Sequence, residues 1–311
     1  MKIPILAYHS NRILGNTYET NDLIALASDL YTIHAQGFRI VPLRWVVEWV
    51  LGLREEATLH KAVAISLDDG ANFDYYDLDH LHWGLQKGVY HILRDFQAQV
   101  GSSAQPNLHA SSFVIVSPEA RREIGTYKGI DWMTDEWWKA ANESGVMSIY
   151  SHSWDHNHPE ASTVCEKNQQ KGSFLTIDTY AECQGEVQQA AEYIHQKIFP
   201  AWPDLFAYPW GQSSNYLREV YFPGFPDQHR TIAAFGGNGG YVTRQSSRWD
   251  LPRFGSAAPW PAGWNSTEQL VQILRGALRF PAASCRALYD AVLRSKQRLA
   301  VWIRRRSQSS E

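Results

Sequence analysis

The clearest strand signal in the sequence is Ala62-Val63-Ala64-Ile65-Ser66-Leu67, which runs directly into Asp68-Asp69-Gly70. Its first six residues form a largely apolar run of strand length, typical of a strand buried on both faces. Similar short apolar runs occur on both sides of it, at 3–8, 38–41, 111–116, 146–150, 205–208 and 231–235. Helical periodicity fills the stretches 21–36, 43–51, 82–100, 135–142 and 179–198. Strands that alternate with helices predict parallel βαβ units.

The length of 311 residues suits one barrel-sized domain. No stretch rich in Ser, Gly or Pro resembles a linker, and no internal repeat is visible. We therefore expect a single domain over 1–311. Helical patterns return at 266–278 and 283–304, so a C-terminal helical extension is expected at about 266–306.

The composition is that of an ordinary globular protein, with 44% apolar and 20% charged residues. Lys and Arg number 29 against 32 Asp and Glu, a formal net charge of −3 that argues against a nucleic-acid partner. No apolar run is long enough for a transmembrane helix. The N-terminal apolar run breaks at Tyr8-His9, short of a signal peptide, so a cytoplasmic location is expected.

Two polar clusters follow predicted strands. Asp68 and Asp69 end one strand, and His152 and His156, four residues apart, lie just beyond another. Each cluster alone also fits a structural role, as an Asp-Gly turn or a polar loop, and His158 leaves the histidine register open. Two histidines and one carboxylate are an established catalytic-metal ligand set, and a spare carboxylate can act as a general base. Together the clusters predict metal-assisted hydrolysis of a carbonyl compound.

Three motifs in order carry a family resemblance: Asp68-Asp69-Gly70, His152-Ser153-Trp154-Asp155-His156 and Phe206-Ala207-Tyr208-Pro209-Trp210-Gly211. The chain resembles the polysaccharide deacetylase family, also called NodB-like or carbohydrate esterase family four. Leu6-Ala7-Tyr8-His9 and Leu251-Pro252-Arg253 resemble the branch that deacetylates poly-N-acetylglucosamine. The resemblance spans about Leu6 to Arg253. It implies an α/β fold, a distorted and incomplete (β/α) barrel.

The resemblance also implies roles for the matching residues. Asp68 resembles the general base, whereas Asp69, His152 and His156 resemble the metal ligands. The loop that contains Tyr208, Pro209 and Trp210 resembles the substrate-groove wall, with the Trp210 backbone N–H near the oxyanion. Zinc fits this ligand set best, although cobalt, nickel, iron and manganese remain open.

The chain departs from the family pattern at two positions. Ala207 stands where many members have an arginine that pairs with the base, and we expect Arg253 to supply that charge, an ordinary surface arginine being the alternative. Many members also have a late Leu-x-His whose histidine is the general acid, but no histidine follows Arg253. We take His9, at the end of the first predicted strand, as the substitute acid; a structural histidine is the alternative.

The expected activity is therefore removal of N-acetyl groups from an N-acetylated sugar or polysaccharide. Two alternatives stay open: a hydrolase of the same fold that acts on a small amide or ureide, and a catalytically silent carbohydrate-binding relative. The basic tail 294–306 fits a helix packed on the barrel, which we favour, or contact with an anionic membrane surface.

Overall fold

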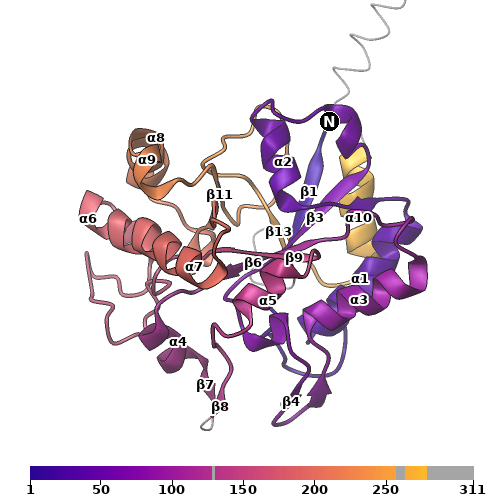
Figure 1. Cartoon of the computed structure of the whole chain (residues 1–311), viewed down its shortest axis with the longest axis horizontal. Helices are drawn as coiled ribbons and strands as arrows, with labels where there is room; N and C mark the ends of the chain where they lie inside the picture. The colour runs from indigo at the N-terminus through magenta and orange to yellow at the C-terminus, as the bar shows by residue number, and fades with distance from the viewer. Residues whose placement is uncertain (128–129, 257–262, 279–311) are drawn as a thin grey trace, which may run out of the picture.

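The computed structural model describes residues 1–127, 130–256 and 263–278. At its centre lies a sheet in which neighbouring strands run parallel in the order β11-β10-β9-β6-β3-β1-β13-β14 (Figure 1). These strands are β1 (Ile3–Tyr8), β3 (Ala62–Leu67), β6 (Ala110–Val114), β9 (Met147–Ser151), β10 (Leu205–Ala207), β11 (Ala233–Phe235), β13 (Phe254–Ser256) and β14 (Gly263–Trp264). Two short strands also pair with interior strands of this sheet: β2 (Arg39–Ile40) pairs with β3, and β12 (Tyr241–Val242) runs antiparallel to β1.

The sheet is curled, and one contact across it demonstrates the curl. Strands β6 and β11 are separated by two strands, so a flat sheet would hold them roughly 14 Å apart. The rings of Phe113 on β6 and Phe235 on β11 nevertheless lie with centroids 5.6 Å apart. Within the described residues no ladder joins β11 to β14. The predicted α/β fold, a distorted and incomplete (β/α) barrel, is therefore confirmed.

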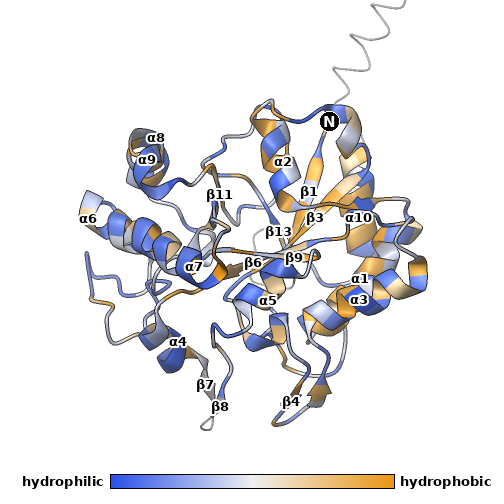
Figure 2. Cartoon of the chain, viewed as in Figure 1, coloured by the Kyte–Doolittle hydropathy of each residue, from blue (hydrophilic) through white to orange (hydrophobic). Residues whose placement is uncertain are grey.

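Helices surround the curled sheet. They are α1 (Asp22–Ala35), α2 (Leu43–Val50), α3 (Val89–Val100), α4 (Pro118–Gly125), α5 (Trp138–Glu143), α6 (Tyr180–Cys183), α7 (Ala190–Ile198), α8 (Phe222–Gly224), α9 (Pro226–His229) and α10 (Thr267–Leu278). Figure 2 shows hydrophobic residues concentrated on the central strands and on parts of the surrounding helices, with hydrophilic residues on other parts of those helices. Each helix therefore buries one side against the sheet or a neighbour.

Alternation along each strand divides the core in two. On β3, Val63, Ile65 and Leu67 belong to the larger cluster, which also contains residues of α1, α3, α5, α7 and α10. Ala62 and Ala64 point to the other face and join the inner cluster with Phe113, Phe235 and residues of α2. Because successive strand residues face opposite sides, a continuous apolar run can serve both cores at once.

Local signals explain the first helix. Asn21 is its N-cap, and its side-chain oxygen accepts the backbone N–H groups of Leu23 and Ile24. The buried residues of α1 recur at spacings of three and four. Gly37 follows in a left-handed conformation with φ of 73°, which stops the helix before β2.

Two predicted helices differ from the structure. The stretch 82–100 is helical only from Val89, because residues before it form the hairpin of β4 (Leu78–His80) and β5 (Gly84–Gln86). The expected helix over 179–198 is present, but six of its residues, η4 (Gln184–Gln189), adopt a π-helical turn between α6 and α7. A second hairpin joins β7 (Thr126–Tyr127) to β8 (Ile130–Asp131).

The C-terminal extension is described only in its first part. Helix α10 covers Thr267–Leu278 of the expected 266–306. The remainder of that extension, including the basic stretch 294–306 for which membrane contact was considered, lies outside the described residues. In the part of the chain that the structure describes, no helix combines the length and apolar character needed to cross a bilayer.

Candidate functional site

The turn after β3 places the two aspartates at the carboxyl end of the sheet. The backbone N–H of Asp68 donates to the carbonyl of Tyr8 at 2.9 Å, which extends the pairing with β1 by one residue. Asp69 and Gly70 then both adopt φ of 74°. A Cβ at position 70 would lie 2.6 Å from Val114, so glycine is required there both for its conformation and for the close approach. Because of this turn in the backbone, the side chains of Asp68 and Asp69 lie in different parts of one cavity.

His152 is fixed by a neighbouring strand. It follows β9 directly, and its Nδ1–H donates to the carbonyl oxygen of Ala207 at 2.9 Å. Because a carbonyl can only accept, this contact leaves the lone pair of His152 on Nε2, the atom that faces Asp69. The hydrogen bond is of the kind that orients a metal-ligating imidazole.

His156 reaches the same place through a tight turn. Ser153 and His156 have φ of 69° and 63°, and the Ser153 hydroxyl oxygen accepts the backbone N–H of His156 at 3.0 Å. The ring centroids of His152 and His156 lie 4.8 Å apart. The turn therefore brings two imidazoles to one point, which a regular extension of β9 would not do.

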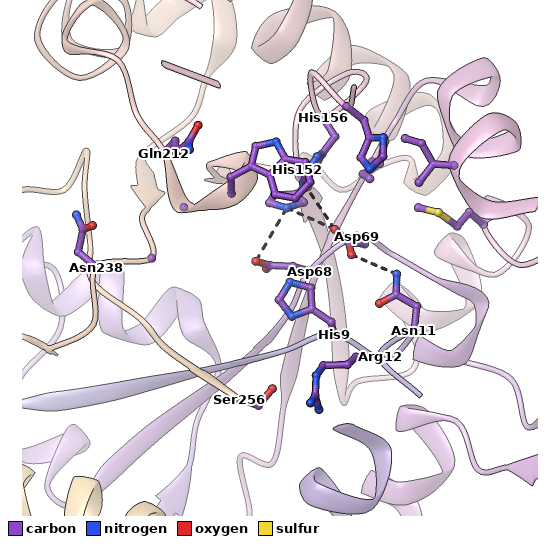
Figure 3. Close-up of a pocket in the computed structure, with 17 residues that line it drawn as sticks. His9, Asn11, Arg12, Asp68, Asp69, His152, His156, Gln212, Asn238 and Ser256 are labelled. Atoms are coloured by element: carbon purple, nitrogen blue, oxygen red, sulfur yellow. Dashed lines mark hydrogen bonds and ion pairs between the residues drawn. The ribbon is translucent and has the colours of Figure 1, made fainter. Parts of the chain in front are cut away.

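Three ligand atoms converge at that point (Figure 3). His152 Nε2 and His156 Nε2 each lie 3.8 Å from Asp69 Oδ1, and one ligand atom from each residue lies within 4.8 Å of the others. Metal bonds of about 2.0–2.2 Å place neighbouring ligand atoms roughly 3–4 Å apart, so the group has the dimensions of a divalent cation site. His158 is not part of this group.

The protonation of the histidines agrees with a ligand role. Burial lowers the pKa of His152, although Asp68 and Asp69 oppose the effect. Burial also lowers the pKa of His156 well below its ordinary value, and the neighbouring histidines add to this. Both imidazoles are therefore neutral near pH 7, the form that donates a lone pair to a metal.

Arg253 pairs with Asp68 beneath this group. The guanidinium donates from Nη1 to Oδ1 at 2.6 Å and from Nη2 to Oδ2 at 2.9 Å, a bidentate contact with Arg253 fully buried. Arg253 also donates to the Gly236 carbonyl and the Ser66 hydroxyl. Burial raises the pKa of Asp68, but Arg253 and then His152 outweigh it and lower the pKa to about 2. The pairing expected from the sequence is present, and it keeps Asp68 ionised.

The surrounding cavity has a volume of about 710 Å³. Its walls include both aspartates, both histidines, His9 and Trp210. His9 therefore lies at the same end of the barrel as Asp69, as its position after β1 predicts, and Figure 3 shows its ring beside Asp68. Ile115, Ile124 and Met133 supply an apolar part of the wall.

The loop after β10 contributes one of its three expected residues to this wall. Trp210 lines the cavity with 49% of its surface exposed, and its ring packs edge-on against His156 at 4.6 Å. Tyr208 instead points to the outer side of the sheet, where it is fully buried and its hydroxyl donates to the Trp249 carbonyl. Pro209 is buried as well and does not line the cavity. Neither side chain therefore lines the cavity, and a role of Tyr208 and Pro209 in substrate binding stays a prediction.

Several cavity residues were not found from the sequence. Asn11 donates to Asp69 Oδ2 at 3.2 Å, and Ser256 ends β13 at the cavity wall. Both follow or end a barrel strand, a position that could have indicated them. Gln212 and Asn238 lie in loops without periodicity, so no sequence signal marks them.

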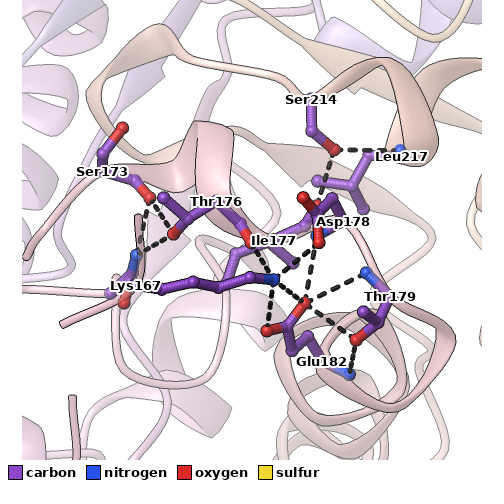
Figure 4. Close-up of polar contacts among 10 residues, drawn as sticks. Lys167, Ser173, Thr176, Ile177, Asp178, Thr179, Glu182, Ser214 and Leu217 are labelled. Carbon is purple, nitrogen blue, oxygen red and sulfur yellow. Dashed lines mark hydrogen bonds and ion pairs between the residues drawn. The ribbon is translucent and has the colours of Figure 1, made fainter. Parts of the chain in front are cut away.

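The long segment after His156 is tied down at both ends. Figure 4 shows Lys167 reaching the carbonyl of Thr176 and the carboxylates of Asp178 and Glu182. Asn157 Nδ2 donates to the Ser173 carbonyl at 2.7 Å. The Gln212 side-chain oxygen in turn accepts from Ser173 Oγ at 3.1 Å, so this segment supports the Trp210 loop. The cavity wall is therefore held by side chains distant in sequence.

A curled parallel sheet with these side chains at its carboxyl end defines the fold class, and comparison with known proteins identifies the particular fold. No family model and no curated protein sequence matches the chain. Solved structures do match. Deacetylase PplD of Streptococcus pyogenes, solved in complex with acetate, aligns with a TM-score of 0.59 and 18% identity, covering 88% of this chain and 98% of its own.

Two further structures align similarly. A polysaccharide deacetylase from Bacillus cereus has a TM-score of 0.55 and 13% identity, with 88% of this chain and 69% of that chain covered. A de-N-acetylase from Aggregatibacter actinomycetemcomitans has a TM-score of 0.54 and 17% identity, with 87% and 100% covered. The chain has the fold of the polysaccharide deacetylases, as its motifs predict.

Proposed function

We propose that the protein is a metal-dependent hydrolase that removes N-acetyl groups from an N-acetylated sugar or polysaccharide. The observation that carries this proposal is the convergence of Asp69, His152 and His156 beside the Asp68–Arg253 pair, inside one cavity. The fold supports it, since the matching structures are named as deacetylases.

Asp69, His152 and His156 would hold the cation. Two neutral imidazoles and one carboxylate suit Zn²⁺, which commonly takes three protein ligands in catalytic sites and leaves a position open. His156 Nδ1 has no hydrogen-bond partner among the described residues, so no hydrogen bond at that atom fixes the tautomer of the ring. When bound, a divalent ion would acidify water and polarise the acetyl carbonyl.

The other residues take the remaining steps of amide hydrolysis. Asp68 accepts the proton of the attacking water, and Arg253 holds its carboxylate ionised and oriented. The backbone N–H of Trp210 donates to the oxygen that becomes negative when the carbonyl is attacked. His9 donates a proton to the departing sugar amine, so that acetate and a free amine are released. The exposed Trp210 ring stacks on a sugar ring.

Acetate release from N-acetylglucosamine oligomers tests the proposal. Zinc-loaded protein should release acetate, and Asp68→Asn should slow the release about 10²- to 10⁴-fold because the general base is lost. Asp227→Asn, an exposed carboxylate on α9, is the matched control and should retain activity. Oligomer binding without acetate release would support a silent relative, whereas activity only on small amides would support the second hydrolase alternative. Either result contradicts the proposal.

A further inference from the structure

The turn that carries His156 is unusual in its backbone. Ser153, His156 and Asn157 all have positive φ values, at 69°, 63° and 42°. Non-glycine residues adopt this region at a cost, so a turn with three of them persists only when surrounding contacts hold it. Some of these contacts lie within the turn, such as the Asp155 carboxylate accepting the Asn157 N–H at 2.9 Å.

One contact comes from a distant helix. Glu186 lies in the π-helical turn η4, and its Oε2 accepts the backbone N–H groups of Trp154 at 3.0 Å and Asp155 at 3.4 Å. The carboxyl group also contacts the side chains of Ser153 and Asp155. Burial and the adjacent Asp155 raise the pKa of Glu186. π-Helical turns occur often at functional sites.

The two histidines differ in how they are held. His152 is fixed by the backbone contact of its N–H with Val114 and by its ring contact with Ala207. His156 has no such ring hydrogen bond among the described residues. Its Nε2 is placed mainly by the turn and by packing against Trp210. A side chain that holds the turn therefore acts on His156 more than on His152.

We propose that Glu186 is a positioning residue that sets the metal affinity of the site by holding the Ser153–His156 turn through the N–H groups of Trp154 and Asp155. This inference rests on the proposed function in so far as that function requires a metal at Asp69, His152 and His156. It assigns Glu186 no contact with substrate or with the metal. Outer partners of metal ligands typically contribute about 10- to 100-fold in affinity.

Direct titration of metal-free protein with Zn²⁺ and Co²⁺ tests the proposal without an activity assay. Glu186→Ala should weaken binding of both ions about 10- to 100-fold and alter the visible spectrum of the Co²⁺ complex. Glu186→Gln, which retains an acceptor oxygen at the same reach, should bind within about threefold of the unsubstituted protein. Glu192→Ala, an exposed carboxylate on α7, is the control and should bind normally.

Other outcomes overturn the inference in distinct ways. If Glu186→Ala binds metal with normal affinity, whether or not its thermal stability falls, Glu186 has only a structural role and the proposal is wrong. A loss in Glu186→Gln equal to that in Glu186→Ala would reject the hydrogen-bond mechanism. If Glu186→Ala does not fold, Glu186→Asp, one methylene shorter, decides the matter by the same affinities. If the unsubstituted protein binds neither ion, the metal dependence itself fails, and this inference falls with it.

Discussion

Among individual side chains, Arg253 shows most clearly how a distant residue completes the site. It lies 185 positions from Asp68 in the sequence, yet the two form a fully buried bidentate pair. Ala207 carries no charge, and Arg253 is the cation that pairs with Asp68. A buried charge without its partner lowers the free energy of unfolding. The contribution of this pair to stability is therefore best measured by removing each partner singly and then both together.

We expect Arg253→Met to lower the free energy of unfolding by about 3–5 kcal/mol, because Asp68 is left unpaired. The double variant Asp68→Asn with Arg253→Met should recover part of the loss. Since the folded pKa of Asp68 is lowered to about 2, the pair stabilises the fold above the ordinary carboxyl pKa and loses this effect as pH falls towards 2. Urea unfolding at neutral and acid pH measures both effects.

Arg94→Met, at an exposed position on α3, is the control for this pair and should change stability by less than about 0.5 kcal/mol. A double variant no more stable than Arg253→Met alone would show that the cost does not come from the unpaired carboxylate.

Trp210 allows binding to be separated from folding. Its φ of 58° favours glycine, and its ring is half exposed, so Trp210→Gly should affect thermal stability little. If the ring stacks on sugar, the same change should raise KM about 3- to 10-fold, whereas Trp210→Phe should retain most of the affinity. Steady-state kinetics on N-acetylglucosamine oligomers gives the values. An unchanged KM in Trp210→Gly would remove the ring from the substrate site.

At the level of helices and strands, Asp29 on α1 joins several elements. Its carboxylate accepts hydrogen bonds from Tyr8 at the end of β1, from Tyr18, and from Trp264 on β14. Burial raises the pKa of Asp29 to about 6, although these three donors oppose the effect. The folded state therefore binds the Asp29 proton more tightly than the unfolded state does.

This raised pKa predicts a pH dependence of stability. The contribution of Asp29 is favourable below the ordinary carboxyl pKa and is lost as pH rises to about 6, by at most about 3 kcal/mol. Asp29→Asn should flatten the stability curve over that interval, because it has no proton to lose. Guanidinium unfolding at intervals between pH 4.5 and 7 provides the comparison. Identical pH slopes in both proteins would contradict the assignment.

For the folded chain as a whole, the proposed cation should act as a stabilising ligand. A metal present at 100 times its dissociation constant adds about 2.7 kcal/mol, which corresponds to a rise of roughly 4 °C in Tm for a chain of this length. Chelation should reverse the rise, and Asp69→Ala should abolish it, whereas Asp227→Asn should show it in full. Differential scanning calorimetry with and without Zn²⁺ measures these shifts. A Tm that does not respond to metal would contradict a preformed cation site.

Local patterns were sufficient for much of this molecule. The strand Ala62–Leu67, the Asp68-Asp69-Gly70 turn and the spacing of His152 and His156 could be identified because apolar periodicity and turn chemistry act over a few neighbouring residues. The placement of these side chains at one end of the barrel followed, since parallel strands end at a common edge. His9 was placed at that end by the same argument.

Other features depend on contacts between segments far apart in the chain, and for these only the three-dimensional arrangement was decisive. The hairpin at 78–86 forms by cross-strand pairing that helical periodicity conceals. The Tyr208 side chain faces the outer side of the sheet because the alternation of side chains along β10 continues to this residue. Strand β10 has only three residues, which are too few for the sequence to show which side chains face outward. Glu186 reaches the His156 turn across 31 or 32 positions. Hydrogen bonds and burial act through space, so these partners become adjacent only when the chain has folded.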